Sequence, residues 1–282
     1  MYFSVITKLL GRIKMKLTKF NLYALGIFYF IYGIWAYIIF MGEPPASAVR
    51  NSVEAGISFF YNIQGTYESV LLMLLPMICL PLLFANNLSQ NRYTGFNKFL
   101  ITRVGSLQRY IRNFFVKTFG ITFVAVLIWQ CLLLLEINLL MSPIKILRSS
   151  RSLKNSLGYI FSQNGYVNLF CFVLLASIGW AIFVCLVLVI SLFIKNPYIF
   201  WGLGLMVGLL LFLIPALLGN GLVSYLFFLP ILIMPGNQII GSDIPSVPLY
   251  IQYGLTALMY MSVTLGLTIL FIRGKFYEEN HQ

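Results

Sequence analysis

The segment NNLSQNRYTGFNKFLITRVGSLQRYIRNFFVK, residues 86–117, is a polar and basic stretch set between two strongly apolar runs. It contains no Asp or Glu but holds six basic residues: Arg92, Lys98, Arg103, Arg109, Arg112 and Lys117. An excess of positive charge is typical of connections between membrane spans that lie on the cytoplasmic side. The sequence therefore predicts that residues 86–117 form a cytoplasmic loop.

Apolar residues within this loop recur at roughly helical spacing. They are Phe96, Phe99, Leu100, Leu107, Ile111 and Phe115. This pattern predicts a partly apolar helix face beside a basic one. The simplest interpretation is a short amphipathic helix, a turn near Gly105 and Ser106, and then a helix that leads into the membrane.

Two pieces of the loop, NRYTGF at 91–96 and FLITR at 99–103, precede Tyr110 and the next span. This order resembles the first cytoplasmic loop of bacterial type-2 ABC exporter permeases, where a coupling helix docks on a separately encoded ATPase. The family often has an acidic residue near the start of the motif, where this chain has Gln90 and Asn91. The resemblance implies seven ATPase-coupling residues: Arg92, Thr94, Gly95, Phe96, Phe99, Leu100 and Arg103. The alternative is that the loop is only a topology signal that holds anionic headgroups.

The composition predicts an all-α integral membrane protein. The 282 residues are 60% hydrophobic and 9% charged, with a mean hydropathy of +0.90, which is too apolar for an ordinary soluble core. The net charge of +12 suggests contact with anionic lipid and an orienting role, because no separate soluble domain is present to bind nucleic acid. Four cysteines lie inside apolar runs without a CxxC pair, so they are interpreted as packing residues and not as disulfide or zinc ligands.

Run lengths predict six transmembrane helices, with both termini in the cytoplasm of a bacterial cell. The predicted spans are residues 20–41, 67–84, 114–141, 167–194, 198–218 and 249–272. Residues 42–68 and 142–165 are then outer loops. The second of these carries four basic residues and no acid, against the positive-inside rule, but the summed charges of all loops still favour this orientation. Pro76 and Pro81 predict that the second span is kinked and faces other protein.

Two segments are expected to interrupt this simple pattern. Residues 1–19 are basic and amphipathic, which predicts an interfacial helix on the inner leaflet, like the elbow helix of the exporter permeases. A signal peptide cleaved after Ala46-Ser47-Ala48 is the rival, but the apolar run of residues 20–41 is longer than the usual 7 to 15 residues. Residues 219–248 contain an apolar run that is too short to span the membrane, which predicts re-entrant helices before the last span. The predicted permease domain covers residues 20–282.

Glu136 is the single acidic residue in the interior of a predicted span, since Glu68 stands at the second residue of the span 67–84. A carboxylate exposed to lipid is costly, so Glu136 is expected to face the bundle interior, pair, or stay neutral. It is a candidate pathway residue, or a structural glutamate close enough to the outer end to reach water.

The chain lacks the residues for several kinds of membrane catalysis. It has one histidine and one aspartate, His281 and Asp243, and no P-loop, so no metal site, paired-aspartate site or ATP site of its own is expected. The leading hypothesis is a permease subunit that exports a hydrophobic peptide, lipid-like molecule or drug. Its expected partners are a cytoplasmic ABC ATPase, which binds ATP and Mg²⁺, and a second permease copy. The alternative is a non-transporting scaffold or sensor subunit whose basic loops bind a partner or anionic lipid.

Overall fold

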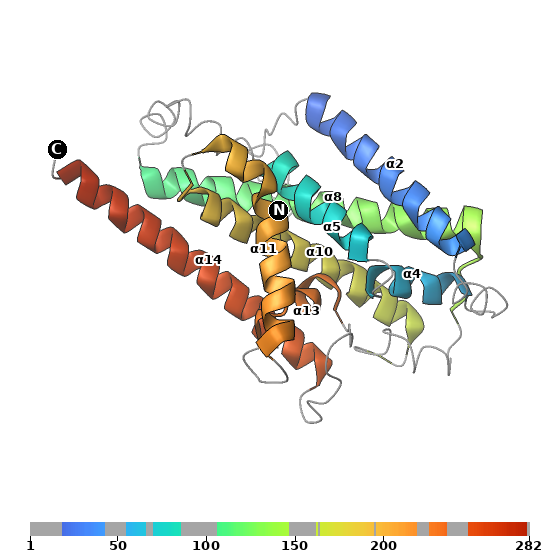
Figure 1. Cartoon of the computed structure of the whole chain (residues 1–282). Helices are drawn as coiled ribbons and strands as arrows, with labels where there is room; N and C mark the ends of the chain where they lie inside the picture. Colours follow the sequence, from blue (N-terminus) through green and yellow to red (C-terminus); the bar gives the residue numbers. More distant parts are fainter. Residues whose placement is uncertain are drawn as a thin grey trace, which may run out of the picture.

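The structure is a computed structural model of the 282-residue chain. It describes residues 19–42, 55–65, 70–85, 106–146, 162, 164–194, 196–218, 226–235 and 248–280. Within these ranges every regular element is helical, as predicted (Figure 1). The elements in chain order are α2 (Lys19–Gly42), α4 (Ala55–Gly65), α5 (Val70–Phe84), α8 (Leu107–Glu136), the π-helix η2 (Ile137–Met141), α10 (Gly165–Ser191), α11 (Pro197–Leu218), α13 (Leu229–Ile233) and α14 (Leu249–Asn280).

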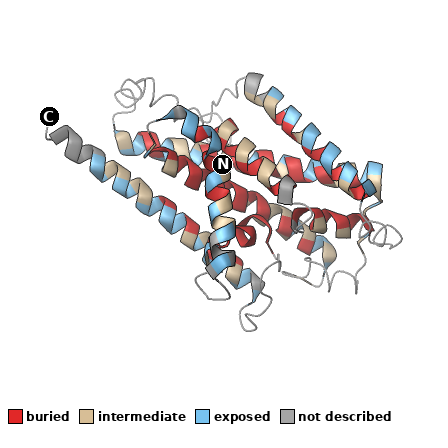
Figure 2. Ribbon diagram, in the orientation of Figure 1, coloured by how far each residue is buried: buried red, intermediate tan, exposed pale blue. Residues whose placement is uncertain are grey.

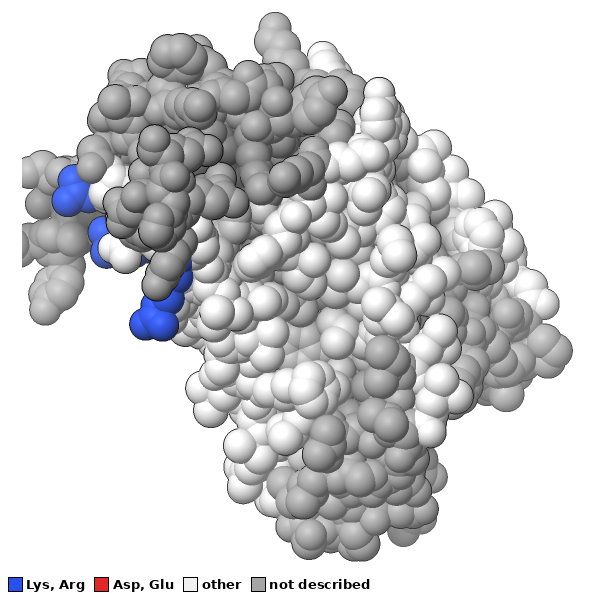
Figure 3. All heavy atoms as spheres, turned by 60° about the vertical axis from the view of Figure 1, so that its left-hand side comes forward, with Lys and Arg blue, Asp and Glu red and all other residues white. Residues whose placement is uncertain are grey.

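Four helical stretches are long and apolar enough to cross a membrane. They are Tyr23–Gly42, Leu107–Met141, Gly165–Ser191 and Tyr250–Gly274. The 27 residues of α10 extend about 40 Å, more than the hydrocarbon core of about 30 Å. Figure 3 shows a broad face on which the described residues carry no charge, with basic side chains gathered at one edge. These features indicate a membrane-embedded protein.

Helix α10 forms the centre of the bundle, and α14 lies at its periphery. In the most apolar window of each helix, 78% of the α10 residues are buried, against 17% for α14. α10 packs along α8 and also contacts α14, α13, α11 and α5. Figure 2 shows the buried residues concentrated along α10 and the facing side of α8. The more apolar helix, α10, is therefore the central one, and α14 is the peripheral one.

Side-chain caps set where the two packed central helices begin. Ser106 is extended, and its Oγ accepts a hydrogen bond from the backbone N–H of Arg109 at 3.2 Å. Asn164 Oδ1 likewise accepts from the N–H of Tyr166 at 3.1 Å at the start of α10. Each cap satisfies one N–H that has no partner inside the helix. The predicted helix leading into the membrane therefore begins at Leu107, and the predicted turn near Gly105 and Ser106 falls largely outside the described residues.

Glycines allow close crossings at two places where the backbone is irregular. Pro81 has no N–H, so the carbonyl of Met77 lacks its i+4 donor, and Gly204 of α11 lies directly against that oxygen. In the same way Gly179 of α10 lies against the carbonyl of Leu232 in the short helix α13. Irregular backbone inside a membrane protein must be buried against protein or water, and these contacts bury it.

The structure also corrects two expectations. Residues 42–68 were expected to be a loop, but Ala55–Gly65 forms α4, whose residues Phe60 and Tyr61 are buried in the bundle. Cys131 is exposed rather than packed inside. The described part of the predicted re-entrant region contains a helix of five residues, α13, which is fully buried. Residues 1–18, 86–105, 147–161, 219–225 and 236–247, which include most of the other predicted special segments, lie outside the described residues.

Candidate functional site

The predicted ATPase-coupling residues all fall in residues 86–105, outside the described part of the chain. The structure does describe the helix that begins directly after them. Ser106 caps α8, and α8 then continues for 30 residues to Glu136 without a break. A helix of that length measures about 45 Å. Glu136 is therefore joined to the end of the segment 86–105 by a single continuous helix.

Polar side chains recur along the side of α8 that faces the bundle. Thr118, Thr122, Trp129 and Glu136 are spaced four, seven and seven residues apart, which places them on one face of an α-helix. The first three are almost fully buried and Glu136 is half-buried. We call these four residues the α8 polar stripe. It runs from the middle of the helix to its last residue.

Two atoms of this stripe lack hydrogen-bond partners among the described residues. They are Thr122 Oγ1 and Trp129 Nε1. A buried polar atom without a partner typically costs about 1–3 kcal/mol, so such atoms are rare in native structures. The side chains themselves are well held, because the Trp129 ring packs edge-on against Tyr32 of α2, with centroids 4.7 Å apart, and contacts Trp180 of α10. The stripe therefore contains two buried polar atoms whose hydrogen-bonding capacity is unused among the described residues.

Glu136 ends the stripe at a break in the regular helix. A Cβ added to Gly33 of α2 would lie 2.5 and 2.8 Å from the two carboxylate oxygens, so the carboxylate fills the notch that this glycine leaves. The π-helix Ile137–Met141 begins at the next residue. Short π-helical insertions occur frequently at functional sites. The structure thus places Glu136 at the α2–α8 contact and turned away from a fully lipid-exposed position.

A second polar group lies beside the stripe, between α8 and α4. Gln130 Nε2 donates to Gln64 Oε1 at 2.7 Å, Gln64 Nε2 donates to the Phe60 carbonyl at 3.2 Å, and Gln130 Oε1 has no partner among the described residues. Gln130 is fully buried. One turn earlier on α4, Asn168 Nδ2 of α10 lies 3.5 Å from the Tyr61 hydroxyl. The bundle interior therefore contains two polar contacts that α4 makes, one with α8 and one with α10.

The sequence alone pointed to Glu136 but not to Thr122, Gln130 or Gln64. A usable signal existed, because Gln130 is an amide in the middle of an apolar run and interrupts it as Glu136 does. Polar residues inside membrane spans generally face protein and mark pathways or helix contacts.

The polar groups of the bundle interior described above are hydrogen-bonding groups. Among the described residues, no three His, Cys, Asp or Glu side chains lie close enough together to hold a metal ion. The arrangement suits the passage or recognition of a polar group inside an apolar bundle. No family model, curated protein or solved structure matches this chain.

Proposed function

We propose that this protein is the permease subunit of an ABC exporter, and that its substrate path follows the α8 polar stripe. The observation that carries the proposal is the row of buried polar side chains on α8, two of them with unpartnered atoms, ending at Glu136. Buried polar groups in a membrane bundle are costly unless a ligand, water or a moving ion uses them. A scaffold subunit would be more stable with apolar residues at these positions.

The proposal assigns six spans to the chain. Four are the long helices described above, and α5 and α11 provide the other two. α5 is short at 15 residues, or about 22 Å, and is bent by its two prolines. The buried helix α13, with Pro230 in its first turn, is the described part of the proposed re-entrant region. In this arrangement both termini and residues 86–117 are cytoplasmic, as the positive-inside rule favours.

The continuity of α8 suggests how the ATPase would act on the stripe. Phe96, Phe99 and Leu100 are proposed to dock on the ATPase, flanked by Arg92 and Arg103. A rigid helix that starts directly after this contact carries a displacement of the loop along its whole length. ATP-driven closure of the partner would therefore shift the stripe against α2 and α10, the two helices that hold Trp129.

The test removes the proposed apolar anchors and compares them with an apolar residue of the same loop that lies off the predicted face. Phe99→Ala combined with Leu100→Ala should leave membrane insertion intact, weaken co-purification with the ATPase, and abolish substrate-stimulated ATP hydrolysis. Apolar anchors at protein interfaces commonly lose about 2 kcal/mol or more on truncation. The control, Ile101→Ala, should retain both properties. Normal coupling by the Phe99 and Leu100 variant would contradict the proposal.

A further inference from the structure

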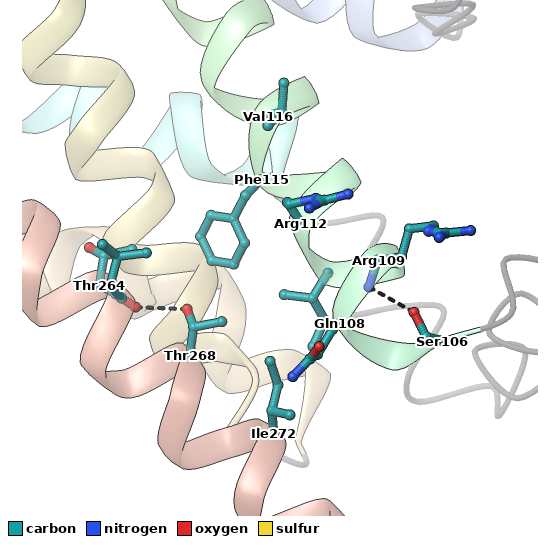
Figure 4. A pocket seen from close by; sticks show the side chains of 11 residues that line it. Ser106, Gln108, Arg109, Arg112, Phe115, Val116, Thr264, Thr268 and Ile272 are labelled. Carbon is teal, nitrogen blue, oxygen red and sulfur yellow. Dashed lines mark hydrogen bonds between the residues drawn. The ribbon is translucent and has the colours of Figure 1, made fainter.

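A cleft of about 590 Å³ opens between the first turns of α8 and the last turns of α14. Figure 4 shows Phe115 from α8 and Thr268 and Ile272 from α14 pointing into the space between the two helices. α14 diverges from the bundle (Figure 1) and is largely exposed, so the cleft is open along its side. Its volume lies within the range of about 300–1,000 Å³ that is usual for small-molecule sites.

The walls of this cleft are apolar, including those parts that carry hydroxyl groups. Thr268 Oγ1 donates to the carbonyl of Thr264, and Thr264 Oγ1 donates to the carbonyl of Tyr260, both at 2.7 Å. These hydroxyls already have acceptors on their own helix. Val116 and Leu265, which also line the cleft, are each more than 60% exposed. Such a surface is suited to hydrocarbon rather than to a water-soluble ligand.

The rim of the cleft is basic. Arg109 and Arg112 lie one helical turn apart on α8 and border the cleft, and Figure 4 shows their guanidinium groups turned away from α14, on the outer side of α8. Both residues are exposed, and in Figure 3 the basic side chains lie at one end of the visible face with no acidic side chain among its described residues. Arginine binds phosphate oxygens in bidentate geometry. The outer side of the first turns of α8 therefore favours an anion, and the walls of the cleft beside it favour an apolar chain.

We propose that this cleft binds one anionic phospholipid, with an acyl chain against Phe115 and Ile272 and the headgroup phosphate at Arg109 and Arg112. The acyl chain of a phospholipid matches the apolar walls of the cleft, and its anionic headgroup matches the basic rim. The positive-inside rule assigns this end of α8 to the cytoplasmic side, where anionic lipids create a negative surface potential. The inference does not depend on transport, because it rests only on the geometry and charge of this cleft.

The test measures lipid retained by the purified full-length chain, using native mass spectrometry with phosphatidylglycerol or phosphatidylcholine as the probe. The wild-type protein should retain one phosphatidylglycerol in preference to phosphatidylcholine. Near a membrane surface each basic residue is worth a factor of about five in affinity for anionic lipid. Arg109→Gln with Arg112→Gln should then reduce the preference about 25-fold, and raising the salt concentration should reduce it in the wild type.

Two further variants separate the cleft from general surface charge. Arg273→Gln removes an exposed basic residue from the same end of α14 without touching the cleft lining, and should leave the preference unchanged. Leu265→Trp fills the cleft and should abolish retention of both lipids. Equal effects of Arg273→Gln and the double arginine variant, or full retention by Leu265→Trp, would overturn the proposal. The proposal would also be overturned if the cleft variants lost a dimer but kept the bound lipid. In that case a second copy of the chain, and not a lipid, would occupy the cleft.

Discussion

Replacing the three glycines of α11 by alanine, one at a time, should give three different results, because each meets a different environment. A Cβ at Gly204 would overlap the Met77 carbonyl and lie 2.9 Å from Pro81 Cγ. Both groups are rigid, so α5 and α11 must separate, at a cost of about 1–3 kcal/mol. A Cβ at Gly208 would meet the Met77 sulfur, a flexible group that can move at a cost of under about 1 kcal/mol. Gly202 has nothing within 4 Å, so alanine there should be neutral or stabilising by up to about 1 kcal/mol.

Thermal unfolding of the purified protein in detergent, followed by tryptophan fluorescence, measures this order. For a chain of this size 1 kcal/mol corresponds to about 2–4 °C in Tm, so Gly204→Ala should unfold several degrees below the wild type. Met77→Ala provides an internal check: added to Gly208→Ala it removes the clash with the sulfur, whereas added to Gly204→Ala it leaves the carbonyl in place. Met77→Ala should therefore reduce the cost in stability of Gly208→Ala but not that of Gly204→Ala. A Gly204→Ala protein as stable as Gly202→Ala would refute the described α5–α11 crossing.

Three other substitutions test separate contacts. Gly179→Ala should lower stability by about 1–3 kcal/mol in the same unfolding assay, because its Cβ would overlap a backbone carbonyl of α13. Gln130→Leu should cost about 1–3 kcal/mol by leaving Gln64 without its partner, whereas Gln64→Leu with Gln130→Leu together should be nearly neutral; equal costs for the single and double variants would argue against this hydrogen bond. Glu136→Gln should preserve the unfolding temperature and lower substrate-stimulated ATP hydrolysis with the partner ATPase, and unchanged hydrolysis would remove Glu136 from the path.

The long helices could be predicted because length and hydrophobicity are local properties. The start of α8 after Ser106 was predictable for the same reason, since a small polar residue before an apolar pattern is a local helix-start signal. α4 was missed because its 11 residues are too few for a span, and polar residues such as Asn62 and Gln64 made the segment resemble a loop. It packs against α5, the next helix in the chain, and against η2, which is distant in sequence.

The site was only partly predictable for a related reason. Glu136 could be identified because a carboxylate in an apolar run is costly wherever it points. Thr122 and Trp129 are ordinary residues for a membrane helix, and their importance depends on the direction in which α8 packs. That direction is set by contacts across the chain, such as the Tyr29 hydroxyl donating to the Ala125 carbonyl at 2.8 Å. No spacing rule within one helix specifies such a partner.

Accessibility of residue 122 to water tests the proposed path along α8 most directly. In a variant with the four native cysteines replaced by alanine, Thr122→Cys keeps nearly the size of the native side chain, and Val124→Cys is the control on the exposed side of the same helix. Membranes containing the chain and its ATPase are treated with a small, membrane-impermeant thiol reagent, with and without ATP. We predict that residue 122 is modified at a rate that changes with ATP, while residue 124 in the lipid stays unmodified. A residue 122 that is unreactive in both states would contradict a substrate path along the α8 polar stripe.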